Sequence, residues 1–346
     1  MMELNQRSLS ILEAIIEGHI ASGEPIGSRT IAKQHKENMS PATVRNVMAD
    51  LEEMGFIASP HTSAGRVPTD KGYRFYVDTM LQVSDLLPRQ RRNIESHCNT
   101  VDLHIEALLR RVGNLLSDMS CYTGVVLVPR FSASRFRHIE FVPLSQNRIL
   151  AIFVSATGAV QNKIIKVEEG LPSADELQQA ANYLNQSLHG MTIRQVRKVI
   201  VEKMQEERVR YDRLMQQALT LSDEVFGSDM DDDIIIEGAA NMLDYPDFAD
   251  PEAMKRLFRA FEKKKLLIEL LDMSQASSGV QVYIGGQTSY QDFRGCSLIS
   301  ARYTNGEEAL GSIGVIGPSR MFYSQVIPVV DYTARLISRM LKRELE

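Results

Sequence analysis

The chain has 346 residues, of which 44% are hydrophobic and 24% charged, and its formal net charge is −5. This composition is typical of a globular protein with two or three domains, and the negative balance excludes a polybasic protein that coats nucleic acid regardless of sequence. Cys98, Cys121 and Cys296 lie too far apart for a Cys-x-x-Cys pair, so we expect reduced, structural thiols. No signal-peptide pattern or long apolar run is visible, so the expected location is the cytoplasm, with no membrane contact.

Two helices are expected before residue 37. Residues 5–21 carry one apolar side and end before Gly23, so this helix supplies hydrophobic backing for the helices that follow. Residues 27–36 are expected to form a short capped helix. A brief turn over residues 37–39 then leads into Ser40.

The most informative local pattern is a helix over residues 41–54. Ser40 suits its N-cap, Pro41 its first position, and Gly55 the position after its end. One side is apolar at three- and four-residue steps, through Val44, Val47, Met48, Leu51 and Met54. The opposite side carries small and polar residues, as expected of a recognition helix that enters a major groove.

A short hairpin is expected after this helix. Residues 56–58 and 66–68 are predicted strands around a turn-rich tip at residues 60–65. Two closely joined helices followed by such a hairpin form a winged helix-turn-helix.

The predicted DNA contacts fall into three groups. Base edges or nearby phosphates are assigned to Thr43, Arg45 and Asn46, because Asn and Arg offer the donor geometry that reads adenine and guanine. Backbone contacts are assigned to Ser28, Arg29 and Ser40. Further contacts through the wing and its flank are assigned to Arg66, Lys71 and Arg74.

Charge placement favours DNA binding over a generic three-helix module. Residues 28–47 and 61–74 together contain seven basic and two acidic residues, a net charge of +5, which leaves −10 for the rest of the chain. A local basic surface on an acidic body attracts phosphate at one face and limits non-specific binding elsewhere. We therefore predict a sequence-specific DNA-binding module over residues 1–84.

A linker helix is expected next. Tyr73 and Tyr76 lie in the helix after the wing, where aromatic residues at helical spacing are expected to pack into a core. Pro88 marks the edge of the module. From Arg89 to about Met119 the apolar spacing predicts one long helix, so residues 85–120 are assigned to a linker.

The second half alternates between strand and helix patterns. Short β-rich runs at residues 125–128, 136–142, 149–154 and 164–167 predict a largely antiparallel sheet, followed by a helix at 174–188. Mostly helical segments are expected at 193–226 and 234–271. The acidic run at 229–233 lacks the glycine and glutamate of a calcium loop, so we expect a solvated turn.

Strand patterns then return at residues 280–284, 296–303 and 309–316, with Asn305-Gly306 predicting a hairpin between the last two, and a final helix is expected at 321–341. Gly311, Gly314 and Gly317 do not match a nucleotide-binding fingerprint, so they are expected to mark bulges or close packing. One α+β domain interrupted by a helical insertion explains this order, with limits at 121–190, 191–275 and 276–346.

Three runs resemble the signature of the heat-inducible transcription repressor family, HrcA: the wing at residues 59–74, the helix start at 40–46 and Gly314–Met321 near the other end. The resemblance covers essentially the whole chain. It implies a homodimeric repressor that binds an inverted-repeat operator upstream of chaperone operons of the groE and dnaK type and is released by heat. It also implies a GAF-like domain interrupted by a dimerising insertion, and activity supported by the GroEL chaperonin.

Two other function classes have less support in the sequence. A ligand-responsive winged-helix regulator would hold a small effector in the GAF-like cavity, an analogy that rests on fold alone. An enzyme is disfavoured because the sequence offers no paired carboxylates, no nucleophile–base spacing, no phosphate loop and no metal set, and its seven histidines are scattered. We therefore expect no enzyme activity, no cofactor and no bound metal.

Overall fold

The computed structural model describes most of the chain, and the statements below concern these residues: 4–34, 39–60, 65–98, 105–129, 136–144, 147–155, 160–167, 172–188, 190–191, 234–262, 264–275, 279–287, 293, 295–306 and 309–345. The chain divides into two compact units, the first formed by residues 1–128 with 234–342 and the second by residues 129–233 with 343–346. Each unit is described by itself.

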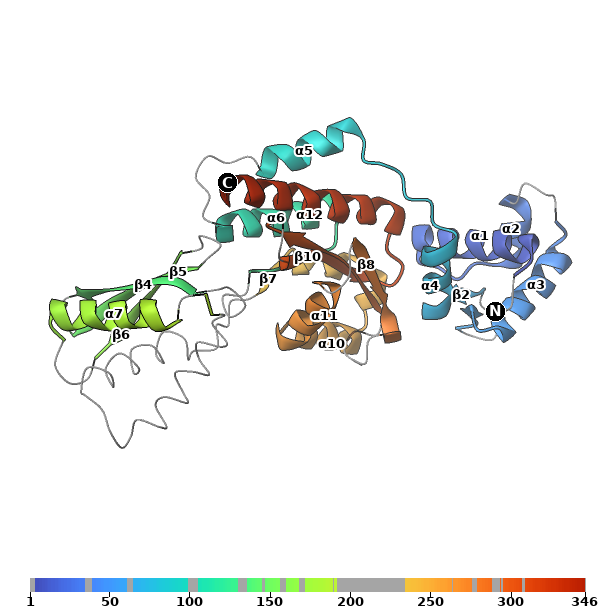
Figure 1. Ribbon diagram of the computed structural model, residues 1–346. Coiled ribbons are helices and arrows are strands. Elements are labelled where there is room, and N and C mark those ends of the chain that lie inside the picture. The colour runs from blue at the N-terminus through green and yellow to red at the C-terminus, as the bar shows by residue number, and fades with distance from the viewer. Residues whose placement is uncertain are drawn as a thin grey trace. The chain divides into compact units, whose positions relative to one another are not determined.

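The first unit begins with a winged helix (Figure 1). Its elements are α1 (Gln6–Ser22), α2 (Ser28–Gln34), α3 (Pro41–Glu53), β1 (Ile57–Ala58), β2 (Val67–Pro68) and α4 (Asp70–Thr79). The two strands pair antiparallel, with Ile57 opposite Pro68 and Ala58 opposite Val67. The two predicted helices and the hairpin are confirmed, whereas residues 35–38 between α2 and α3 and the wing tip at residues 61–64 lie outside the described residues.

The core of the winged helix forms because three helices turn their apolar sides inward. Its fully buried members include Ile11, Ile15, Ile31, Val44 and Leu51. Tyr73 and Tyr76 of α4 are also buried in this core, which confirms the packing role expected of them. A side chain on Gly72 would collide with the carbonyl oxygen of Phe56, so glycine lets α4 pass close to the end of β1.

The predicted single helix over residues 89–119 is wrong. Two helices are present instead, α5 (Pro88–Cys98) and α6 (Ile105–Ser120), and they pack on each other. A straight helix cannot bring its two halves together, because every residue advances the chain along one axis. Ile94, Cys98 and Leu109 are buried in the same hydrophobic cluster, which α5 and α6 share as two separate helices.

A five-stranded antiparallel sheet lies at the centre of the first unit, in the order β7-β3-β10-β9-β8. Its strands are β3 (Thr123–Leu127), β7 (Ile234–Glu237), β8 (Val280–Ile284), β9 (Cys296–Thr304) and β10 (Ala309–Pro318). The predicted hairpin at Asn305-Gly306 is confirmed, since β9 and β10 pair throughout. A bulge between Ala309 and Gly311 fits the expectation that the strand glycines mark irregular or tight packing.

Residues 234–237 were expected to begin a helix, and this prediction is wrong. Three consecutive isoleucines start β7, where Ile234 pairs with Leu127 and Ile235 with Val126. Runs of β-branched residues fit a pleated, buried surface better than a helix. Helical structure follows only afterwards, in η3 (Ala239–Asp244), η4 (Pro246–Phe248), α10 (Pro251–Glu262) and α11 (Lys264–Gln275).

Helices cover both faces of this sheet (Figure 1). One face packs against α6 and the long C-terminal helix α12 (Tyr323–Leu345), in a hydrophobic cluster that also includes the winged-helix core. The other face packs against α10 and α11, where Leu257, Leu267 and Leu271 meet Val125 and Leu298. The first unit is thus a winged helix followed by a mixed α/β domain.

The second unit contains a separate three-stranded antiparallel sheet in the order β4-β5-β6. Its elements are β4 (Phe136–Leu144), β5 (Arg148–Ser155), β6 (Val160–Lys166) and α7 (Ala174–Leu188). Phe136 and Phe153 of the sheet and Leu177 and Leu184 of α7 form a core of their own. The sequence placed these strands in one sheet with β3, and this expectation is wrong because their apolar sides are already covered by α7.

The grouping of residues therefore differs from the limits expected from sequence. Residues 129–190 fall in the second unit, whereas the sequence placed 121–190 with the sheet domain. In the part of the second unit that the structure describes, the strands and the helix expected at 136–188 are present as β4, β5, β6 and α7. The helices predicted over 193–226 and the turn at 229–233 lie outside the described residues.

Candidate nucleic-acid interface

The start of α3 is fixed by a side-chain cap. The Ser40 hydroxyl oxygen accepts a hydrogen bond from the Thr43 backbone N–H at 3.1 Å, and the two hydroxyl groups lie 2.9 Å apart. Pro41 occupies the first turn, where no backbone N–H is needed. Capping satisfies a donor that would otherwise be orphaned, and it fixes where α3 begins relative to α2.

The outer side of α3 is open to solvent. Val44, Met48 and Leu51 are buried, while Arg45 and Asn46 on the other side are exposed. Neither Arg45 nor Asn46 makes a hydrogen bond or ion pair to another described residue, so their donors are available to a ligand. Ala42 and Ala49 are exposed on this side, and their small side chains allow α3 to approach the floor of a groove closely.

Helix α2 adds a second basic element beside α3. Ser28 is half-buried at its start and Arg29 is exposed, with no partner among the described side chains. Lys33 in the last turn of α2 is also exposed. Lys33 was counted in the basic charge of this segment but was not predicted to contact DNA. Because its side chain is exposed, we add it to the candidate contacts.

Arg66 is engaged inside the winged helix. Its Nε and Nη2 donate to the same carboxylate oxygen of Glu52, at 2.9 and 2.8 Å, and its Nη1 donates to the Ser59 hydroxyl at 3.3 Å. Its backbone forms an isolated bridge with Ile26. The guanidinium therefore fastens β2 to the last turn of α3, and its charge is already compensated.

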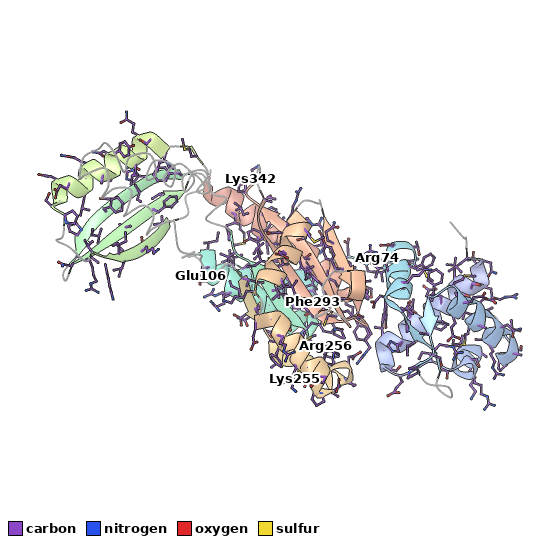
Figure 2. The ribbon with its side chains drawn as sticks, turned by 90° about the horizontal axis from the view of Figure 1, so that it is seen from below. Arg74, Glu106, Lys255, Arg256, Phe293 and Lys342 are labelled. Carbon is purple, nitrogen blue, oxygen red and sulfur yellow. The ribbon has the colours of Figure 1, made fainter. Side chains whose placement is uncertain are left out.

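Lys71 and Arg74 also have partners within the first unit. Lys71 Nζ donates to the Met54 carbonyl oxygen at 2.7 Å, at the C-terminal end of α3, and lies 4.7 Å from the centre of the Phe56 ring. Arg74, labelled in Figure 2, forms an ion pair with Asp78 and donates from Nη1 to the Val282 carbonyl oxygen at 2.6 Å. Lys71 therefore joins α4 to the end of α3, and Arg74 joins α4 to β8.

A buried ion pair at Arg320 was not predicted from the sequence. Arg320, after β10, is 9% exposed and pairs with Asp247, from Nη2 at 2.7 Å and from Nε at 2.8 Å. Its Nη1 lies 3.5 Å from the Ile20 carbonyl oxygen at the end of α1. Arg320 therefore touches both the winged helix and the segment before α10. The sequence feature that could have pointed to Arg320 is its position in the Gly-Pro-Ser-Arg run at residues 317–320.

His19 lies beside this ion pair. Its Nδ1 is 2.7 Å from the Tyr73 hydroxyl, which joins α1 to α4. Burial lowers the pKa of His19 below its ordinary value, and the nearby Arg320 charge lowers it further, while Asp247 and Glu24 act in the opposite direction. At neutral pH the His19 imidazole is therefore uncharged, and it packs between α1 and α4.

Comparison with known proteins decides the family. A family profile described as "Winged helix-turn-helix transcription repressor, HrcA DNA-binding" matches residues 3–80, and one described as "HrcA protein C terminal domain" matches residues 106–327. The heat-inducible transcription repressor HrcA of Geobacter sulfurreducens is 50% identical over 99% of this chain and 100% of its own. The chain belongs to the HrcA family. It is a heat-inducible transcription repressor with a winged-helix DNA-binding domain.

Other HrcA relatives match along their whole length as well. The HrcA repressors of Syntrophobacter fumaroxidans and Methylobacillus flagellatus are 42% and 41% identical, over 99% and 98% of both chains. A solved structure titled "Crystal structure of a hypothetical protein at 2.2 A resolution" is similar with a TM-score of 0.60 and 22% identity, covering 99% of each chain. That likeness supports the fold.

The HrcA family consists of transcription repressors rather than enzymes. Within the described ranges, no three His, Cys, Asp or Glu side chains gather in a metal-binding group. Among the helices that the structure describes, none is both long and apolar enough to cross a bilayer. The resemblance stated from the wing, the helix start and the Gly314–Met321 run is confirmed at the level of the family.

Proposed function

We propose that two copies of this repressor place their α3 helices in successive major grooves of an inverted-repeat operator in the cytoplasm. The observation that carries the proposal is the exposed pair Arg45 and Asn46, unpartnered in the described structure, on a capped helix in a winged helix-turn-helix. A two-fold protein assembly matches a two-fold DNA sequence, because each copy then reads an equivalent half-site.

Within each half-site the roles differ. Thr43, Arg45 and Asn46 contact base edges or adjacent phosphates, since they lie on the open side of α3 or at its capped start. Ser28, Arg29 and Ser40 contact the DNA backbone from the N-terminal ends of α2 and α3.

For Arg66 of the wing and for Lys71 and Arg74 of α4, we propose a positioning role as the main one. Arg66 and Lys71 position the wing and α4 through Glu52 and Met54, and Arg74 joins α4 to β8 through the Val282 carbonyl oxygen. Direct phosphate contact by these three is secondary, because a compensated cation attracts an anion less strongly.

The operators proposed are those of chaperone operons of the groE and dnaK type, as the family resemblance implies. Heat releases repression by lowering the population of dimers that bind DNA, and a chaperonin of the GroEL type restores it. A shift of a few kcal/mol between the two populations suffices for this response.

The test is titration of the purified protein onto promoter fragments of its own chaperone operons, with and without chaperonin. We expect a complex with two chains per operator in sedimentation analysis, and tighter binding when chaperonin is present. A complex with one chain per operator, or equal affinity for promoter and unrelated DNA, would overturn the proposal.

A further inference from the structure

The first unit carries a second strongly basic segment, outside the winged helix. Residues 253–265 contain six basic residues and one acidic residue, in a part of the chain that is acidic overall. Three of the basic residues, Lys255, Arg256 and Arg259, lie on α10 and are exposed. We call these three residues the basic face of α10. Figure 2 shows Lys255 and Arg256 on this helix.

The orientation of α10 follows from its apolar side. Leu257 and Phe261 are 1% and 7% exposed, and they pack with α11 against the five-stranded sheet. Burial of these two side chains turns the neighbouring basic residues Lys255, Arg256 and Arg259 outward. The basic face is therefore held in place by a core, and its direction does not depend on the basic residues themselves.

Two of the three charges are uncompensated within the described structure. Lys255 pairs with Glu252 at 2.9 Å on the helix surface, an exposed contact of small energy. Arg256 and Arg259 form no hydrogen bond or ion pair with another described residue. Exposed guanidinium groups without a carboxylate partner suit phosphate oxygens, which they bind in a bidentate manner.

One residue of the basic face, Arg256, borders the wing side of the winged helix. Arg256 and Leu257 line a cleft of about 450 Å³ together with Val67 and Pro68 of β2 and His19 of α1. The carboxylates of this cleft are engaged elsewhere, since Asp247 pairs with Arg320 and Asp70 accepts from the Gly286 backbone N–H at 2.8 Å. Neither carboxylate therefore neutralises the charge of Arg256.

From the two uncompensated arginines and the place of Arg256 beside the winged helix, we infer that the basic face of α10 is a second phosphate-binding surface, which contacts operator DNA flanking the half-site read by α3. The inference rests on the proposed function, because it extends the same protein–DNA interface. The partner is the DNA backbone, which carries a dense negative charge and needs no base-specific donors. It would lengthen the footprint without changing the sequence that is read.

The experiment compares the full-length protein with the double variant Arg256→Gln/Arg259→Gln on two duplexes. One is a chaperone promoter fragment with at least 15 base pairs on each side of the protected repeat, and the other is cut to the repeat alone. We expect about a 5- to 20-fold loss of affinity on the long duplex near 0.1 M salt, and a slope of log K against log salt that is smaller by about two. On the short duplex we expect less than a two-fold change.

Two controls separate the charge from the fold. Arg92→Gln/Arg111→Gln removes the same charge from exposed positions on α5 and α6, away from α10, and should leave both slopes unchanged. Arg256→Lys/Arg259→Lys keeps the charge and should retain most of the slope. Thermal unfolding of all variants checks that the core beneath α10 is intact.

The outcomes are distinct. Equal slopes for the wild type and Arg256→Gln/Arg259→Gln, with affinities within two-fold on the long duplex, overturn the inference and leave the proposed function standing; the basic face then serves an acidic protein or no partner. An equal loss on both duplexes also overturns it, since the face would act on the half-site itself. Absence of wild-type binding to any promoter fragment overturns the proposed function.

Discussion

Arg66 of β2 and Glu52 of α3 form an ion pair in which two guanidinium nitrogens meet one carboxylate oxygen, at 2.8 and 2.9 Å. The pair joins the wing to the end of the recognition helix, and its two side chains are 28% and 34% exposed. At this exposure the pair contributes about 1 kcal/mol or less to stability. Its larger effect is on charge, because it neutralises an arginine close to the proposed DNA surface.

Substitution Glu52→Gln should therefore strengthen DNA binding. The amide still accepts a hydrogen bond from Arg66, but the removed negative charge leaves the guanidinium free to attract phosphate. We expect a few-fold tighter binding to operator and random DNA alike, with a salt slope larger by about one. Fluorescence-anisotropy titration over a salt series measures both quantities. Unchanged affinity would show that this pair lies away from the DNA.

Substitution Asn46→Ala should reduce sequence discrimination. Removing a base-reading amide from the open side of α3 costs about 1–3 kcal/mol on the operator, with little change on random DNA. The matched control is Arg29→Ala, a predicted phosphate contact, which should weaken both DNAs similarly and lower the salt slope by about one. Competition titration distinguishes the two patterns, and equal losses from Asn46→Ala on both DNAs would remove Asn46 from the set of base readers.

Loss of Arg320 should destabilise the first unit. Arg320→Ala leaves Asp247 without its partner and removes the donor near the Ile20 carbonyl oxygen, so the free energy of unfolding should fall by about 2 kcal/mol. Arg335→Ala, which breaks an exposed ion pair with Asp331 on α12, should change it by less than about 0.5 kcal/mol. Urea denaturation measures both, and similar values for the two variants would contradict the buried role of Arg320.

Stability should depend on pH through His19. Because the folded protein lowers the pKa of His19 below 6.5, the unfolded chain binds more protons between the two pKa values. The free energy of unfolding should therefore fall as pH falls from about 6.5 to the lowered pKa, and stay level in this contribution above 6.5. His19→Gln, which can still accept from Tyr73, should make the difference in stability between pH 7.5 and 5.5 smaller. An undiminished difference would assign the effect to other groups.

Local patterns carried the prediction of the winged helix, since caps and apolar spacing are properties of neighbouring residues. The partners of the wing residues are not local. Arg66 meets Glu52, 14 residues earlier, and Arg74 meets Val282, 208 residues later. A basic side chain that is free and one that is already paired look alike in sequence, which is why these two were assigned to DNA.

Strand pairing was harder to predict for the same reason. The runs that form β3 and β4 follow each other in the chain, yet β3 joins β7 and β10 while β4 pairs with β5. Which strands pair depends on what covers their apolar faces, and α7 supplies that cover for β4 to β6. The sequence did not predict α5 and α6 as separate helices, because an apolar side at helical spacing does not show where one helix ends and the next begins.

The most direct test of the central claim is methylation interference on a chaperone promoter fragment with the purified full-length protein. Two α3 helices in successive major grooves predict interference at purines in two symmetric clusters, with centres one helical turn of about 10–10.5 base pairs, or a multiple of it, apart. Each cluster should weaken with Asn46→Ala. A single cluster, or two clusters without a two-fold axis between them, would contradict the account.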